Sequence, residues 1–364
     1  MKTTLYKLLF ALLLVPAISF ANNGYKGKYT EQKKIKKEFK VGPQDLLKID
    51  NSYGNIDITT WNENRVVIEV LIETNGNDED KVKDRLKEID VDFRQTGGMV
   101  SAETLLEKNH NGGSWLSSLF GSSSNVNIKI NYRVKAPATN SVDLSNDYGS
   151  INLDKLDGNA KISCDYGRLL IGELNGDNNY LSFDYTDNSN IGYMKRGKIS
   201  ADYSEFTIDE AGTLELSADY TESNIQKVEN IKFSCDYGSL KIDKLKNMRG
   251  TGDYLGVKLG NVYGSLDLRM DYGSLSVEKV MAGLKQMDVN TDYTSIKIGY
   301  DKEAPFRFEV STEYGGIKGL GKGFTVNKRI DSGSDNYYEG YYLSGNSGGT
   351  IKVESSYGSV TFMD

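Results

Sequence analysis

Apolar and polar residues alternate along most of the chain, in short runs that are interrupted at regular intervals by a tyrosine. Before Tyr237, for example, Ile231, Phe233 and Cys235 alternate with polar residues, and the alternation resumes after Gly238. A period of two residues on both sides of a glycine turn predicts two β-strands, each with one buried face. The same alternation, continued through the turn, places Tyr237 itself on the buried face.

The tyrosines that mark these runs follow an acidic residue and recur at steps of 17 to 21 residues, so the sequence is a tandem repeat. They are Tyr148, Tyr166, Tyr185, Tyr203, Tyr220, Tyr237, Tyr254, Tyr272, Tyr293 and Tyr314. A further copy, Tyr357, lies 43 residues beyond the last of these, about two steps away, and Tyr53 is an outlying copy. A unit this short cannot bury its apolar face alone, so neighbouring units must stack and share one core.

The repeat therefore predicts an all-β fold, a single-stranded β-helix or β-solenoid, with right-handed coiling favoured. At about 4.8 Å per layer, the ten consecutive units would make a rod of about 50 Å. The residue two before each tyrosine is usually small, as at Cys164, Ala201 and Gly252, with Phe183 and Met270 as exceptions. Small residues at this phase are consistent with a crowded corner.

The residues that precede the repeat tyrosines share one phase of the repeat, and we expect them to form an outward column of carboxylates. They are Asp147, Asp165, Asp184, Asp202, Asp219, Asp236, Asp253, Asp271, Asp292 and Glu313. Carboxylates at such a spacing repel by roughly 1 kcal/mol even in water. We expect each Asp to offset this by accepting the backbone N–H two residues on. Calcium between layers is the alternative, which Ser52 and Ser356 in the terminal copies disfavour, so no metal ligand is predicted.

The region before the repeat has a different pattern. A strand pair surrounds Tyr53, and the alternating run 66–72 follows it. Asp78 is then the expected N-cap of a short helix at about 78–90. The region thus predicts more strands with one helix among them.

A Ser/Gly-rich loop at about 107–125 contains the apolar string Trp115–Phe120. We expect this string to pack over an open end of the rod, or else to form an exposed contact tip with Trp115 as a candidate ligand-binding residue. The predicted boundaries are an N-terminal β-rich region over 22–140 and a repeat region over 141–364, irregular at about 321–349.

The N-terminus carries Lys2 and Lys7, then an apolar run from Leu8 to Val15 and a small-residue site that ends at Ala21. This order predicts a signal peptide over 1–21. No stretch approaches the roughly 20 apolar residues of a transmembrane helix. Because the first mature residue is not Cys, we also expect no lipid anchor, and hence a protein of the periplasm, the cell surface or the medium.

Several of these motifs resemble the bacterial putative adhesin family. They are the segment from Leu47 to Ile56 with Ser52-Tyr53-Gly54 inside it, Trp61, Val66, the strand Ile130–Val134 that leads to Pro137, and the repeated Tyr-Gly units. The resemblance covers roughly residues 33–364. It implies an exported single-stranded β-helix, mostly without assigned activity among its members, and it brings no catalytic residues to this chain.

Residues suited to catalysis are sparse. His110 is the only histidine, so Ser-His-Asp and Cys-His arrangements have no supported base, and zinc-ligand spacing is missing. Cys164 and Cys235 lie four units apart, about 19 Å at the layer spacing, whereas a disulfide needs Cα atoms within about 7 Å. We therefore expect two buried free thiols, no disulfide between them, no cofactor and no catalytic residue.

The irregular segment near the C-terminus contains the candidate ligand-binding residues Tyr337, Tyr338, Tyr341 and Tyr342. Aromatic rings with a polar tip suit contact with a sugar. The alternative is a hairpin in which every second tyrosine packs on the last repeats and the others are merely exposed.

Taken together, the sequence predicts a non-enzymatic, exported envelope or cell-surface protein of structural or adhesion type, a rigid acidic rod that contacts a surface glycan or protein. The formal charge of −7, which becomes −9 without the two lysines of the signal peptide, argues against nucleic acid as the partner. Specific carbohydrate binding by the Tyr-rich segment is the alternative. A polysaccharide-active β-helix enzyme is a third hypothesis, disfavoured because acids are evenly spread and arginines are few.

Overall fold

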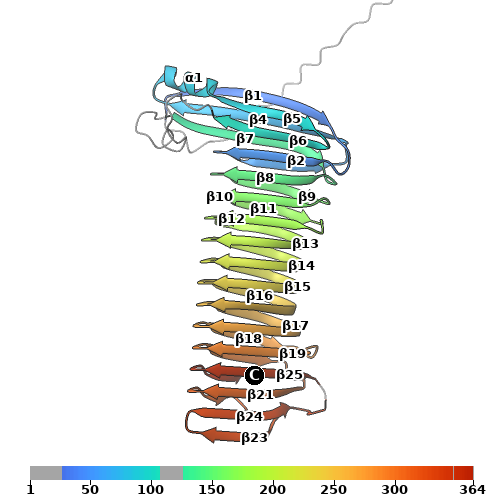
Figure 1. Cartoon of the computed structure of the whole chain (residues 1–364), viewed down its shortest axis with the longest axis vertical. Coiled ribbons are helices and arrows are strands. Elements are labelled where there is room, and N and C mark those ends of the chain that lie inside the picture. The colour runs from blue at the N-terminus through green and yellow to red at the C-terminus, as the bar shows by residue number, and fades with distance from the viewer. Residues whose placement is uncertain (1–26, 107–125, 347, 364) are drawn as a thin grey trace, which may run out of the picture.

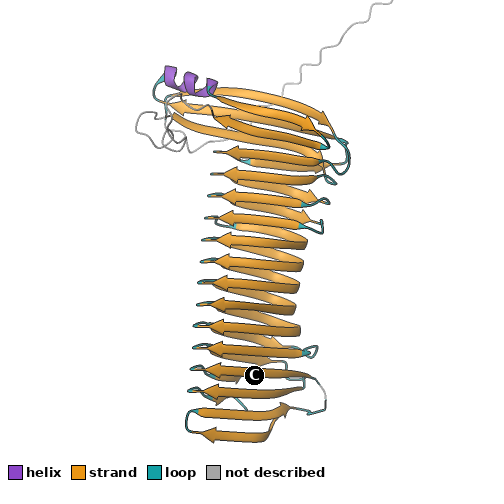
Figure 2. Cartoon of the chain, viewed as in Figure 1, coloured by secondary structure: helices purple, strands orange, loops and turns teal. Residues whose placement is uncertain are grey.

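The computed structural model describes residues 27–106, 126–346 and 348–363. In this part of the chain, 26 strands form one long, open sheet, and one short helix lies at its N-terminal end (Figures 1 and 2). The signal peptide, the loop over 107–125 with Trp115, and His110 lie outside the described residues. The fold is therefore all-β with a single helix.

The N-terminal end is built from seven strands and the helix. They are β1 (Tyr29–Lys40), β2 (Leu46–Ser52), β3 (Ile56–Trp61), β4 (Arg65–Gly76), α1 (Glu79–Lys87), β5 (Ile89–Thr96), β6 (Met99–Leu106) and β7 (Val126–Pro137). The side chain of Asp78 accepts a hydrogen bond from the backbone N–H of Lys81, so it is the expected N-cap of α1. The helix is shorter than predicted because Ile89, which is fully buried, already belongs to β5.

The strands that follow form two rows, which we call the leading row and the trailing row. Each leading strand ends at the acidic residue before a repeat tyrosine, and each trailing strand begins just after that turn. The strands are β8 (Ser141–Asp147), β9 (Ser150–Leu156), β10 (Ala160–Asp165), β11 (Arg168–Leu174), β12 (Asn179–Asp184), β13 (Ser189–Asp202), β14 (Glu205–Asp219), β15 (Glu222–Asp236), β16 (Ser239–Asp253), β17 (Gly256–Asp271), β18 (Ser274–Val280), β19 (Gln286–Asp292) and β20 (Ser295–Tyr300).

Both rows are parallel and in register. In the leading row, Asp147 lies opposite Asp165, which lies opposite Asp184. Each strand from β13 to β17 is long and belongs to both rows. Its first half pairs in the trailing row and its second half pairs in the leading row. The edge-to-face contact of Phe183 in β12 with Phe206 in β14 crosses from one row to the other, and the apolar residues between the rows form one continuous core.

The C-terminal end departs from chain order. Its strands are β21 (Phe306–Glu313), β22 (Ile317–Lys318), β23 (Phe324–Ser332), β24 (Asp335–Tyr342), β25 (Gly349–Ser356) and β26 (Val360–Met363). Strand β25 pairs in parallel with both β19 and β21 and so lies between them, while β24 and then β23 continue beyond β21 as an antiparallel hairpin (Figure 1). Tyr357 is thus one layer from Tyr293 and one from Tyr314, rather than two steps beyond the latter.

Candidate functional site

The repeat tyrosines lie at the turns between the leading and trailing rows, and from Tyr148 on their side chains point to solvent, whereas the hydroxyl of Tyr53 is buried. Tyr237 has a φ of 53°, and every other repeat tyrosine likewise has a positive φ. The prediction that Tyr237 faces the core was wrong: its side chain is 46% exposed. Strand alternation ends at Asp236, and the left-handed backbone of the next residue turns the ring outward.

The outward rings form one continuous stack, which we call the tyrosine column. In spatial order it consists of Tyr53, Tyr148, Tyr166, Tyr185, Tyr203, Tyr220, Tyr237, Tyr254, Tyr272, Tyr293, Tyr357 and Tyr314. Neighbouring ring centroids are 4.6 to 5.3 Å apart, and neighbouring ring planes differ by 1 to 11°. Stacked aromatic pairs stabilise a protein by about 0.5–1.5 kcal/mol beyond their buried area.

Hydrogen bonds between layers hold the backbone of each turn. The N–H of Tyr220 donates to the carbonyl oxygen of Asp236 at 3.0 Å, and the N–H of Tyr237 donates to that of Asp253 at 3.0 Å. A bulky residue in the left-handed region is strained by about 1 kcal/mol or more. The stack and the interlayer hydrogen bonds together offset that strain at every layer.

The residue after each tyrosine fits the turn in one of three ways. A Cβ atom added at Gly149 would lie 1.8 Å from the carbonyl oxygen of Gly54, so the layers approach too closely there for a side chain. In other layers a hydroxyl fills the corner: Oγ1 of Thr221 donates to the carbonyl oxygen of Asp219 at 2.9 Å. After Tyr254, Leu255 instead buries an apolar side chain in the core. All three arrangements leave the tyrosine with a positive φ.

The acidic residues before the tyrosines form the expected outward column, here called the aspartate column, but their hydrogen bonds differ from the prediction. In five layers the carboxylate accepts from the next layer and not from the residue two positions on. Oδ1 of Asp184 accepts from the N–H of Asp202 at 3.1 Å, and Oδ1 of Asp236 from the N–H of Asp253 at 2.8 Å. The same bond links Asp202 with Asp219, Asp219 with Asp236, and Asp271 with Asp292.

Charge and desolvation act on both columns in the same direction. Partial burial, followed by the neighbouring carboxylates, raises the pKa of Asp147 and of Asp253. Desolvation, followed by the neighbouring phenols, raises the pKa of Tyr237 and of Tyr272 from the ordinary value of tyrosine. These two rings therefore carry neutral hydroxyls at physiological pH, each able to donate and to accept a hydrogen bond.

The other flank of the tyrosine column is also acidic in its middle. The residues two after Tyr185, Tyr203 and Tyr220 are Asp187, Glu205 and Glu222, and all three are exposed. Arg168 is the one basic residue at this phase of the repeat units in the described chain. Leading strands such as β8, β13 and β15 all end at the same edge of the rod, on the left of Figure 1, so the column runs along that edge.

The four tyrosines predicted to bind a ligand near the C-terminus do not share one surface. They lie on β24, where Tyr338 and Tyr342 are buried, at 7% and 6% exposure, and Tyr337 and Tyr341 are partly exposed. Tyr342 packs in the aromatic cluster that closes the core, with its ring centroid 5.4 Å from that of Phe306. The segment is therefore a hairpin in which alternate tyrosines are buried, and ligand binding by Tyr337 or Tyr341 stays a prediction.

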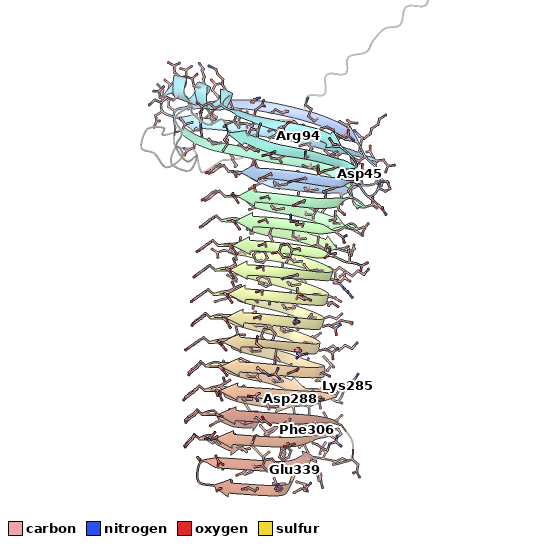
Figure 3. The ribbon with its side chains drawn as sticks, viewed as in Figure 1. Asp45, Arg94, Lys285, Asp288, Phe306 and Glu339 are labelled. Atoms are coloured by element: carbon pink, nitrogen blue, oxygen red, sulfur yellow. The ribbon has the colours of Figure 1, made fainter. Side chains whose placement is uncertain are left out.

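Tyr337 is the candidate that lines a hollow, and Nζ of Lys328 lies over its ring, 4.8 Å from the centroid. A shallow hollow of about 400 Å³ lies over the last layers of the leading row, and Tyr337, Ser311, Glu354 and Asp335 line it. The hydroxyl of Tyr337 donates to Oε2 of Glu339 at 3.1 Å. Desolvation and this carboxylate raise the pKa of Tyr337 to about 12. Glu339 is labelled in Figure 3, near the C-terminal end of the rod.

No family model and no curated protein matches the chain. Among solved structures, a putative adhesin from Parabacteroides distasonis is 10% identical over 74% of this chain and 93% of its own, with a TM-score of 0.33. A putative adhesin from Bacteroides fragilis is 10% identical over 91% and 97%, with a TM-score of 0.29. A putative cell adhesion protein from Clostridium sporogenes is 11% identical over 91% and 99%, with a TM-score of 0.18.

Both cysteines are buried free thiols, as expected. Burial raises the pKa of Cys164 and of Cys235 to about 12, so both stay protonated at neutral pH. A buried thiol without thiolate character is not a nucleophile.

Acids also line a groove on the trailing row, as the site of an enzyme would require. Glu210 and Asp209 line a polar groove of about 780 Å³ there, but each is bonded within it. Nζ of Lys227 lies 2.7 Å from Oε1 of Glu210, and the amide of Gln226 donates to Oδ1 of Asp209 at 2.7 Å. Within the described ranges, no group of three His, Cys, Asp or Glu residues is placed to hold a metal ion. No helix in those ranges is long and apolar enough to cross a membrane.

Proposed function

We propose that the chain is a non-enzymatic protein of the bacterial envelope or cell surface, a rigid β-solenoid that uses its tyrosine column to contact a surface glycan or protein. The observation that carries the proposal is the unbroken stack of twelve tyrosines along one edge. Exposed aromatic surface of this extent marks interaction sites. Asn or Gly would occupy the left-handed turns with less strain, so retention of Tyr at every layer points to a use of the ring.

The solenoid is supported by the parallel, in-register pairing of both rows over successive layers. Right-handed coiling is favoured because crossovers between parallel strands are right-handed in nearly all proteins. Export is supported by the lysines, apolar run and cleavage site within residues 1–21. We place the mature protein in the periplasm, at the cell surface or in the medium. We keep 22–140 as the N-terminal region and 141–364 as the solenoid.

Binding of the purified exported protein to envelope material of the producing bacterium tests the proposal. The triple variant Tyr203→Asn, Tyr220→Asn, Tyr237→Asn removes three central rings and keeps residues that tolerate a positive φ. We expect at least a tenfold loss of binding in a sedimentation assay, with the circular dichroism of the wild type.

The matched control replaces tyrosines outside the column. Tyr180 and Tyr263 are 38% and 41% exposed and lie on strands, away from the turns. The double variant Tyr180→Asn, Tyr263→Asn should bind as the wild type does. Equal binding by the triple variant and the wild type would show that the column is not the contact surface.

A second candidate function is recognition of a sugar at the hollow around Tyr337, which the ring and the polar groups lining that hollow support. Glycan-array binding should then be lost in Tyr337→Ala and retained in Tyr341→Ala. If the wild type binds no glycan on the array, or if both variants lose binding equally, the hollow around Tyr337 is not a sugar site.

A further inference from the structure

We propose that the tyrosine column binds a linear, positively charged glycan, a chain of amino sugars that lies parallel to the rod axis. The inference rests on the proposed function, because it names the partner of the same surface. It follows from the exposed parts of the rings, the charges beside them and the spacing of the layers.

The stacking geometry excludes a partner that needs the face of a single ring. Within the column each ring face is covered by a neighbour, with centroids 4.8 Å apart between Tyr203 and Tyr220 and again between Tyr237 and Tyr254. From Tyr148 to Tyr314 the rings remain partly exposed, repeated once per layer. A partner that contacts such a row along its length must itself be linear, and it gains one edge contact and one hydroxyl partner for each layer that it spans.

The charge beside the column selects a cationic partner. The aspartate column flanks one side, and Asp187, Glu205 and Glu222 flank the middle of the other. In several layers one carboxylate oxygen accepts an interlayer N–H, as Oδ1 of Asp219 does from Asp236 at 3.1 Å, which leaves the second oxygen for a partner. Ammonium groups form charge-assisted hydrogen bonds with carboxylates, whereas a second copy of the chain would bring its own carboxylates against these.

The layer spacing favours a sugar chain over a basic peptide. Side chains on one side of an extended peptide recur at about 6.6 Å, and the turns of an α-helix at about 5.4 Å. Ring centroids in the column recur at 4.6 to 5.3 Å, so the extended peptide loses register within a few layers and the helix more gradually. An extended chain of β-1,4-linked sugars advances by close to one layer per sugar. The hydroxyls of such a chain can form hydrogen bonds with the phenols of the tyrosine column, and its ammonium groups can bind the carboxylates of the aspartate column.

Calorimetry with three hexamers tests the inference. The probes are a fully deacetylated glucosamine hexamer, its N-acetylated counterpart and hexalysine, all at low ionic strength. We expect the deacetylated sugar to bind at least tenfold more tightly than either of the other two. The triple variant Tyr203→Asn, Tyr220→Asn, Tyr237→Asn should lose this binding.

Charge variants separate the contribution of the carboxylates. Asp202→Asn, Asp219→Asn, Asp236→Asn keeps an oxygen for each interlayer N–H and removes three charges, so it should fold as the wild type does and bind the deacetylated hexamer at least tenfold less tightly. Glu215→Gln, Asp267→Asn removes two charges from the outer face of the leading row, away from the turns, and should leave binding unchanged.

Each alternative outcome has a distinct meaning. Equal binding of hexalysine would overturn the sugar assignment, and equal binding of the N-acetylated hexamer would overturn the need for charge. If no hexamer binds while the tyrosine triple variant still loses envelope binding, this inference fails and the proposed function stands. If the triple variant keeps its envelope binding, the proposed function fails as well.

Discussion

Tyr237 and Tyr338 both follow strand residues, yet the ring of Tyr237 is exposed to solvent and the ring of Tyr338 is buried. Tyr338 lies within β24, where side chains alternate between the two faces, and it falls on the covered face. Tyr237 lies one residue past the end of its strand, where a φ of 53° reverses the expected direction. The difference shows that the alternation rule ends with the last extended residue. A single left-handed residue turns a core position into a surface column.

The largest effect should come from the buried set of tyrosines. Tyr342→Ala removes a ring from the cluster of Phe306, Phe324 and Tyr300 that closes the C-terminal end. Large-to-small changes of buried aromatics cost about 3–5 kcal/mol, so chemical denaturation should show a loss of this order. Tyr341→Ala, on the opposite face of β24, should cost about 1 kcal/mol or less. Similar losses in the two variants would contradict the assignment of faces.

An intermediate effect is expected where the turns pack layer on layer. A Cβ added at Gly149 meets the carbonyl oxygen of Gly54 at 1.8 Å, whereas one added at Gly256 meets nothing closer than 3.8 Å. Gly149→Ala should therefore destabilise the protein by about 1–3 kcal/mol through overpacking. Gly256→Ala should be close to neutral in the same thermal melt. An equal melting temperature for the two variants would mean that the layers can separate at the turn.

A smaller effect is expected within the tyrosine column. Tyr220→Asn removes two stacking contacts, each of about 0.5–1.5 kcal/mol, and relieves about 1 kcal/mol or more of left-handed strain. The expected net loss of unfolding free energy is therefore about 0–2 kcal/mol. A loss above about 3 kcal/mol would indicate that the ring is buried after all.

The smallest effect concerns the pKa of the aspartate column. Because the pKa of Asp253 is raised in the folded state, folding favours its protonated form, and stability falls as the pH rises through its carboxyl range near 4. Asp253→Asn should remove that fall and raise stability at pH 7 by a few tenths of a kcal/mol, since exposed charges are screened. Paired urea titrations at pH 3.5 and 7 measure the difference, and a variant less stable at pH 7 would reverse the sign.

The strands, the acidic column and the helix cap follow from local pattern, because period-two alternation and an Asp before a helix act through neighbouring residues. Asp78 and the outward Asp236 are examples. The direction of Tyr237 was missed because a positive φ is rarely adopted by a bulky residue. The hydrogen bond from Asp253 to Asp236 was missed because it joins different layers. Of the candidate residues on β24, pattern alone left open which ones would be covered.

The position of β25 affects the order in which the chain can assemble. Strand β21 leaves the ribosome, and any export channel, before β25 does, yet β25 lies between β21 and β19 in the finished sheet. Each earlier layer of the repeat can add to the layer made just before it, but the last layers cannot form until residues 349–363 are available. Until then the edge of β19 is open, and β21 or a strand from another molecule can occupy it in the wrong register. Completion of these layers therefore depends on residues 349–363, and a chain cut before them would expose an unpaired, aggregation-prone edge at β19.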